Sequence, residues 1–289
     1  MRIKFWGTRG SIPVPGKSTL KYGGNTPCVE VYEGGDEITI IDAGSGIREL
    51  GNEIINNSSI KRINILISHF HWDHIQGLPF FSPLYNPDYE INFYSSRKKI
   101  VPNENIFDVL MQPLFFPVTK KVLNAKINFS GIKEGTRFQL NDYEIDTVKT
   151  HHSLGTVAYK LAKGNKSFVY MTDSEIFYDA ENNEPDLVLI KKHNKDIIEF
   201  CEGCTYLVHD AMYTAEDFKE KIGWGHSSNI SSVLFAAACG AKNLLLFHYE
   251  PKYSDKKIDE MLEETNELIR EKKLKLNCYA SKDNMEIKL

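Results

Sequence analysis

Six short apolar segments of the sequence each lead, within three residues, into a histidine or an aspartate. The segments have the length and the β-branched or aromatic content of strands, and several are apolar at consecutive positions, as in sheets covered on both faces. They are Ile38–Ile41 before Asp42, Ile63–Ile67 before His69, Tyr143–Val148 before His151 and His152, Ser167–Thr172 before Asp173, Tyr206–Val208 before His209 and Asp210, and Leu244–Phe247 before His248. Because a rigid sheet positions such residues along one edge, the repeated pattern indicates one shared site.

Helical segments are interleaved with these strands. Ser228–Cys239 begins with capping-type residues and stops at Gly240, and Ser254–Lys273 is apolar on one face and charged on the other. A length of 289 residues suits one large domain or two small ones, and no repeat or Ser/Gly-rich linker divides the chain. We expect a mixed α/β fold in a single domain, residues 1–289.

Composition excludes several classes of protein. The net charge is −4, with 42% hydrophobic and 26% charged residues, which argues against a disordered chain and against a dedicated nucleic-acid binder. Five scattered cysteines indicate reduced thiols rather than a disulfide framework. The N-terminus lacks the apolar stretch of a secretory signal, and no apolar run approaches the ~20 residues that span a bilayer. A cytoplasmic location without membrane attachment is the expectation.

The most specific motif is His69-Phe70-His71-Trp72-Asp73-His74. Alternation places His69 and His71 on one side of a strand end, where two imidazoles can bind one metal ion, whereas Asp73 and His74 turn toward a second ion. Nitrogen ligands with a few carboxylates suit Zn²⁺, with Mn²⁺ or Fe as alternatives. The competing interpretation is a histidine-rich surface loop that binds nothing.

Three later segments supply the remaining candidate ligands. His151 and His152 are neighbours in an extended segment and point to opposite faces, so only one of them can join His69 and His71. Asp173 offers two oxygens and can bridge two metal ions, unless it is only a cap or turn residue. His248 would complete the second ion's ligands, unless it is a satisfied core histidine.

These motifs together resemble the metallo-β-lactamase fold superfamily over nearly the whole chain. The resemblance rests on the Asp42 segment IDAGSG, on HFHWDH, and on His152, Asp173 and His248 in that order. It points to the phosphodiesterase and ribonuclease Z-like branch, because GWGHSS places His226 upstream of His248, and because GTRGSIPVPG, YGGNTPCVEV and HDAMYT are similar to segments of hydrolases of that branch. It implies a four-layer αββα sandwich of two mixed β-sheets flanked by helices.

The resemblance also implies a ligand set for two divalent metal ions. His69, His71 and His152 would hold one ion, Asp73, His74 and His248 the other, and Asp173 would bridge them. In relatives the third histidine stands seven residues before a tyrosine, here Tyr159, which favours His152. The chain has Thr-His-His-Ser where relatives often have Asn-His-Pro-Gly, so His151 stays open. Asp42 would orient the ligands, and Asp210 is a further, uncertain site residue.

Such a centre predicts a metal-dependent hydrolase, most directly a phosphodiesterase. Two divalent ions, two aspartates and a metal-bridging hydroxide leave a net positive site, which suits an anionic phosphodiester. Asp73 and His226 are the expected catalytic residues. His226 would protonate the leaving alkoxide or steady the phosphoryl oxygens, and it could also cap the following helix.

We expect the substrate to be a small nucleotide or cyclic nucleotide, with no stable nucleic-acid partner. The first alternative is a tRNA 3′-end endoribonuclease, disfavoured because only 20 residues separate His152 from Asp173, where such relatives carry a long tRNA-gripping arm. Two further hypotheses are hydrolysis of a thioester, ester or lactam, and a non-catalytic metal-binding module. A homodimer stays open, because relatives of this fold are frequently dimers and the aromatic stretches Phe80–Pro87 and Met111–Pro117 could pack an interface or wall the pocket.

Overall fold

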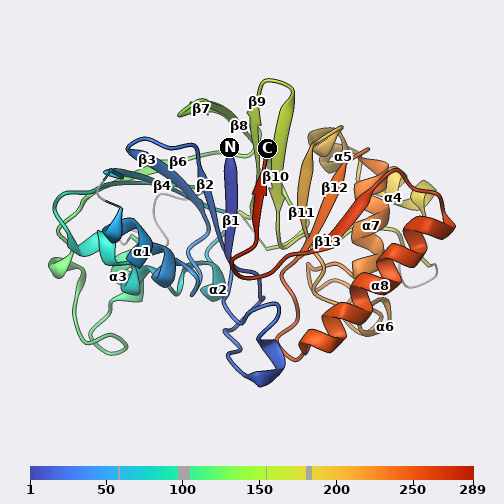
Figure 1. Cartoon of the computed structure of the whole chain (residues 1–289), viewed down its shortest axis with the longest axis horizontal. Helices are drawn as coiled ribbons and strands as arrows, with labels where there is room; N and C mark the ends of the chain where they lie inside the picture. Colours follow the sequence, from blue (N-terminus) through green and yellow to red (C-terminus); the bar gives the residue numbers. More distant parts are fainter. Residues whose placement is uncertain (58, 97–104, 154, 180–183) are drawn as a thin grey trace.

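Two seven-stranded sheets pack face to face in the centre of the molecule, and helices cover their outer faces (Figure 1). The structure is a computed structural model that describes residues 1–57, 59–96, 105–153, 155–179 and 184–289. The two termini lie side by side between the halves, because the last strand pairs with the first. This is the four-layer αββα arrangement that the resemblance implies.

The first sheet is built from the N-terminal half of the chain and closed by the C-terminal strand. Strands β3 to β6 run parallel, whereas β14, β1, β2 and β3 pair antiparallel. The order is β14 (Glu286–Lys288), β1 (Arg2–Gly7), β2 (Cys28–Tyr32), β3 (Glu37–Ile41), β4 (Arg62–Ile67), β5 (Glu90–Ser95) and β6 (Lys126–Gly131).

The second sheet has the same mixture of pairings. Strands β10 to β13 run parallel, and β7 to β10 form an antiparallel meander. The order is β13 (Asn277–Ala280), β12 (Asn243–Phe247), β11 (Tyr206–Asp210), β10 (Lys166–Met171), β9 (Val157–Lys163), β8 (Tyr143–Lys149) and β7 (Arg137–Leu140). The six strands expected from the sequence all form, within one to two residues of their predicted ends.

Helices cover each sheet on its outer side (Figure 1). One apolar cluster joins the outer face of the first sheet to α1 (Ile47–Asn56) and α3 (Ile106–Leu110). Another joins the second sheet to α4 (Leu187–His193), α5 (Lys195–Cys201), α6 (Ala215–Phe218), α7 (Asn229–Ala238) and α8 (Asp255–Glu271). The short helices are α2 (Trp72–Ile75), η1 (Lys17–Thr19), η2 (Leu78–Phe80), η3 (Ser82–Tyr85) and η4 (Lys120–Val122).

Both predicted helices are present, with the expected boundary residues. Ser228 caps α7 by accepting a hydrogen bond from the Ser231 amide, and Gly240 follows the helix with a positive φ of 64°. The Ser254 hydroxyl caps α8. All five cysteines are buried and free. None of the helices in the described ranges combines the length and apolar content needed to cross a bilayer.

A third apolar cluster fills the space between the sheets. The rings of Phe5 in β1 and Phe247 in β12 lie 6.1 Å apart, centroid to centroid, across this layer. Polar contacts cross the same layer near the strand ends: the Tyr159 hydroxyl of β9 donates to the carbonyl oxygen of Ile67 at the end of β4, at 2.7 Å. Tyr159 therefore links the two sheets at the end of β4, two residues before His69.

Replacing Tyr159 with Phe removes this inter-sheet hydrogen bond from a fully buried position. We expect Tyr159→Phe to lower the free energy of unfolding by about 1 kcal/mol, because a buried acceptor loses its donor while the ring packing is kept. Urea denaturation measures the change. Tyr279→Phe is the control, since this side chain is 43% exposed, and should leave stability unchanged. An equal loss in both variants would contradict the assignment.

Candidate active site

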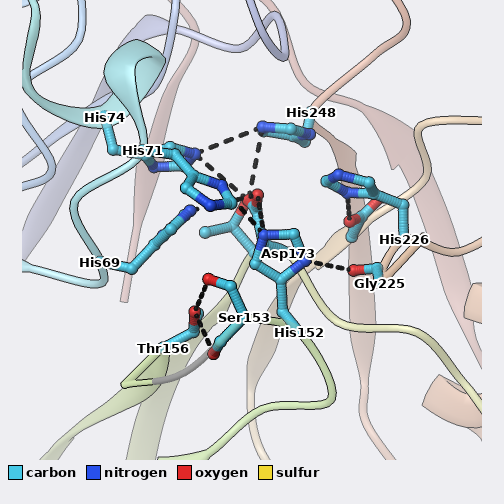
Figure 2. Close-up of polar contacts among 12 residues, drawn as sticks. His69, His71, His74, His152, Ser153, Thr156, Asp173, Gly225, His226 and His248 are labelled. Carbon is cyan, nitrogen blue, oxygen red and sulfur yellow. Dashed lines mark hydrogen bonds and ion pairs between the residues drawn. The ribbon is translucent and has the colours of Figure 1, made fainter. Parts of the chain in front are cut away.

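The site lies where parallel strands of both sheets end and their connecting loops meet. Asp42 follows β3, His69 follows β4, and Asp173 and His248 follow β10 and β12. The structure brings together all seven residues that the sequence analysis grouped as ligands, in two sets that could each hold a metal ion (Figure 2). The first set is His69, His71, His152 and Asp173; the second is Asp73, His74 and His248.

Asp173 stands between the two sets. Its Oδ2 lies 3.5 Å from Nε2 of both His69 and His152, whereas its Oδ1 lies 3.3 Å from His74 Nε2 and 3.4 Å from His248 Nε2. One oxygen therefore faces each set. This is the geometry that a carboxylate shared by two cations requires.

The ring nitrogens that point inward are suited to metal rather than to one another. His152 Nδ1 lies 2.9 Å from the Gly225 carbonyl oxygen, to which only a protonated nitrogen can bond, so Nε2 of the neutral ring carries a lone pair. His152 Nε2 lies 3.1 Å from Nδ1 of His71 (Figure 2). Nε2 of His69 is buried without a hydrogen-bond partner in the part of the chain that the structure describes. Burial also lowers the pKa of His69 well below its ordinary value, which favours the neutral, metal-binding form. Divalent cations fit this donor set.

The buried carboxylate of Asp42 organises the second set. It accepts hydrogen bonds from the amide and hydroxyl of Ser68, from Nδ1 of His74 and from the Tyr170 hydroxyl, each at 2.8 Å. Because Nδ1 of His74 is held outward, its Nε2 points to Asp73, Asp173 and His248. Asp42 therefore has the orienting position that the resemblance implies.

Three residues of the site have left-handed backbone conformations. The φ angles are 60° at Asp42, 47° at Asp173 and 62° at His248. Each stands just after a strand, where the chain must turn abruptly to aim the side chain across the sheet edge. Non-glycine residues in this region are uncommon and concentrate at functional sites.

A loop near the N-terminus supports the second set. The sequence analysis did not predict this support. The Ser11 amide donates to Asp73 Oδ2 at 2.7 Å, and the His248 amide donates to the Thr8 carbonyl at 2.9 Å. Gly10 packs so closely that a Cβ there would lie 2.6 Å from the His248 ring. The GTRGS segment containing this loop was visible in the sequence, but its contacts use backbone atoms and so leave no side-chain signal.

His226 lies beside both sets and is paired with a buried carboxylate. Its Nδ1 is 2.6 Å from Asp210 Oδ2, and its ring stacks on His248 with centroids 5.1 Å apart. Burial would lower the pKa of His226, but the carboxylate of Asp210 outweighs it and raises the pKa to about 9. Asp173, Asp210, His226 and His248 also offer donors close enough for a cation. The capping role considered for His226 is wrong, because Ser228 is the cap of α7.

Two further histidines, His151 and His209, face away from the metal-binding sets. His151 stacks on Phe177 with centroids 4.2 Å apart, and its Nδ1 contacts the Glu175 carbonyl oxygen at 3.1 Å. His209 is buried on the opposite side of β11, against Phe235 and the Ser232 hydroxyl. The structure therefore separates His152 from its neighbour, as opposite faces of an extended segment require.

The fold and the convergent donors define a metal-dependent hydrolase of the αββα class. The family model described as "Beta-lactamase superfamily domain" matches residues 39–249, and the chain belongs to this family. The matched range contains both sets of donors and the His226–Asp210 pair.

Individual relatives are distant but align over nearly their whole length. The chain is 24% identical to a protein named ribonuclease Z from Picrophilus torridus, covering 99% of this chain and 94% of the relative. Among solved structures, the metallo-β-lactamase fold protein YhfI from Bacillus subtilis superposes with a TM-score of 0.70 at 17% identity, covering 99% and 98% of the two chains. A diphosphatase of the PhnP family superposes with a TM-score of 0.64 at 21% identity, covering 100% and 97%.

Asp42 offers a test of how the donors are held. Asp42→Ala leaves the buried Ser68, His74 and Tyr170 donors without their acceptor, so we expect the free energy of unfolding to fall by about 3 kcal/mol. Asp42→Asn should fold and bind metal roughly tenfold or more weakly, because His74 loses its charged partner. Urea denaturation and metal content by plasma mass spectrometry measure the two effects. The exposed residue Asp88 gives the control, Asp88→Ala; wild-type metal affinity in Asp42→Asn would contradict the orienting role.

Proposed function

We propose that this protein is a dinuclear-metal phosphodiesterase. His69, His71 and His152 would hold one divalent cation, Asp73, His74 and His248 would hold the other, and Asp173 would serve both sets. The observation that carries the proposal is the division of the two Asp173 oxygens between the two sets of imidazoles. When bound, the cations would supply an activated water molecule as nucleophile and neutralise the charge of the phosphodiester. Zn²⁺ is the first candidate, and Mn²⁺ or Fe the alternatives.

The charge of the site favours an anionic substrate. Two divalent cations outweigh the carboxylates of Asp73 and Asp173, which are buried at the centre. The carboxylate of Asp210 raises the pKa of His226, which favours a positive charge at the edge. A phosphodiester carries a negative charge that this arrangement attracts and that a neutral ester or lactam lacks.

His226 is the proposed proton donor to the leaving group. Its Nδ1 is bound to Asp210, so Nε2 is the nitrogen left to face the substrate. Asp210 raises the pKa of the ring and fixes its orientation, and its other oxygen accepts the Met212 amide at 2.9 Å. A proton held at Nε2 stabilises the alkoxide that leaves as the P–O bond breaks.

For the substrate, similarity in sequence favours RNA. The relative from Picrophilus torridus is named ribonuclease Z, and it aligns over almost the entire chain. This supports the endoribonuclease interpretation more strongly than the small-nucleotide interpretation that the sequence analysis preferred. We therefore place cleavage of a phosphodiester near an RNA 3′ end first.

One structural feature keeps a small nucleotide as the second candidate. Strands β9 and β10 are joined by the tight turn at Gly164 and Asn165, so this part of the chain has no room for an RNA-gripping arm. The alignment with the ribonuclease Z relative extends over 324 positions, more than the 289 residues of this chain, so the relative carries segments that this chain lacks.

Metal removal and a His226 variant test the chemistry. Hydrolysis of bis(p-nitrophenyl) phosphate should disappear after treatment with a chelator and return on adding Zn²⁺ or Mn²⁺. With a dinucleotide such as ApA as substrate, whose leaving group is an alkoxide, His226→Ala should lower kcat about 100-fold or more, because proton transfer to the leaving group is lost, while metal content stays at the wild-type level. His193→Ala, a change at an exposed histidine of α4, is the control. Absence of turnover in metal-loaded protein would refute the phosphodiesterase.

A comparison of substrates separates the two candidates. If RNA is the substrate, kcat/KM for a tRNA precursor with a 3′ trailer should exceed that for 2′,3′- and 3′,5′-cyclic nucleotides by about 100-fold or more, because a longer chain adds backbone contacts. The measurement is a competition assay at fixed salt. A preference of similar size for a cyclic nucleotide would reject RNA in favour of the second candidate.

A further inference from the structure

A cavity opens on one side of the metal-binding residues. Its volume is about 500 Å³, and its wall includes the candidate ligands His71 and His152. Lys149, Phe177 and Trp224 line the same cavity and take no part in the proposed metal-binding sets. A group attached to a phosphate at the metal centre could therefore extend into this cavity.

Trp224 has an exposed side chain, and the backbone of its loop is held by hydrogen bonds. Its side chain is 60% exposed, an unusual state for so large an apolar ring. The two glycines that flank it are both fastened to one carboxylate, because the amides of Gly223 and Gly225 donate to Glu175 Oε1 and Oε2 at 2.9 Å. The Gly225 carbonyl in turn accepts from His152 (Figure 2). The loop that carries the ring is thus tied directly to a candidate metal ligand.

Phe177 is the second exposed ring of the cavity, and it too is supported from within. One face stacks on His151 at an interplanar angle of 14°, yet 43% of the side chain is exposed. Its backbone amide donates to Asn194 Oδ1 at 3.1 Å, and its carbonyl accepts from Asn194 Nδ2 at 2.8 Å. Asn194 itself is buried. These contacts fix the ring at the cavity rather than leaving it free to fold away.

The charges of the cavity complement a nucleotide. Lys149 is exposed at the wall, and Nζ of Lys221 lies 4.2 Å from the Trp224 ring centroid. The carboxylate of Glu175 has its negative charge directed at the two glycine amides. Rigid, exposed aromatic rings beside cations are the usual means of binding a base without reading its sequence.

We propose that this cavity, lined by Phe177 and Trp224, binds a nucleobase of the substrate by stacking while the adjoining phosphodiester occupies the metal centre. The inference deepens the proposed function and rests on it: it names a base-bearing substrate rather than a simple alkyl phosphodiester. It also gives His151 a role, as the inner support of Phe177 rather than as a ligand.

The test compares two ligands that differ only by the base. AMP should bind the metal-loaded protein about tenfold more tightly than ribose 5-phosphate, because stacking contributes only with AMP. Isothermal titration calorimetry measures both affinities. In Trp224→Ala and Phe177→Ala this preference should shrink toward equality, and Trp224→Phe should restore part of it. Equal affinities in the wild type, or an undiminished preference in both alanine variants, would overturn the proposal.

Controls separate this proposal from the proposed function. Phe115→Ala removes a phenylalanine that is 73% exposed and outside the cavity, so the preference for AMP should persist. If bis(p-nitrophenyl) phosphate is hydrolysed but AMP gains nothing over ribose 5-phosphate, only the base-binding cavity is rejected. If AMP is preferred but no phosphodiester is hydrolysed, the phosphodiesterase is rejected and the cavity stays.

A longer ligand identifies the source of the base. The dinucleotide ApA should bind more tightly than AMP if the base belongs to RNA, because each ligand carries one phosphate but ApA offers a second base for stacking. Equal affinity for ApA and AMP would identify a free nucleotide. Both results support the stacking cavity, and weaker binding of ApA and AMP than of ribose 5-phosphate would refute it.

Discussion

The carboxylate of Asp42 connects the parts of the molecule on which the site depends. Asp42 directly follows β3 in the first sheet. Its carboxylate accepts a hydrogen bond from the Ser68 amide, which follows β4, and another from the Tyr170 hydroxyl of the second sheet. The same oxygen that receives Tyr170 also holds His74. A buried charge of this kind is tolerated only because several donors surround it. In return, this one group orients His74 and connects the first sheet to Tyr170 of the second.

The centre crowds imidazoles and carboxylates into a small buried volume. Nε2 of His74 and Nε2 of His248 lie 3.3 Å apart, and carboxylates approach the same nitrogens. The surrounding sheets hold these groups in place with contacts outside the centre, such as the Gly225 carbonyl and the Ser11 amide. Metal affinity and stability of the fold are therefore coupled, because cations bind donors that the folded state brings together and the unfolded chain keeps apart.

Much of the fold followed from the sequence, because apolar runs that end in polar residues report strands and their ends together. The αββα class was predicted correctly. Alternation in an extended segment predicted that only one of His151 and His152 faces the site, and the resemblance favoured His152 while leaving His151 open. The structure places His152 beside His71 and His151 against Phe177. The contacts of Ser11 and Gly225 could not be predicted, since they are made by backbone atoms whose positions depend on loops distant in sequence. The substrate could not be predicted either, because the ligand motif specifies the metal-binding residues and not the surface around them.

The left-handed turns at Asp42, Asp173 and His248 restrict how such a centre can evolve. Aspartate and histidine are among the few non-glycine residues that enter this conformation with any frequency, so the backbone and the coordination chemistry select the same residue types. A change to cysteine or glutamate, which also bind metals, would meet a local conformational cost before any question of affinity arose. The path of the main chain alone therefore disfavours thiolate ligands at these left-handed positions. It also disfavours the shift toward softer metals that thiolates would bring.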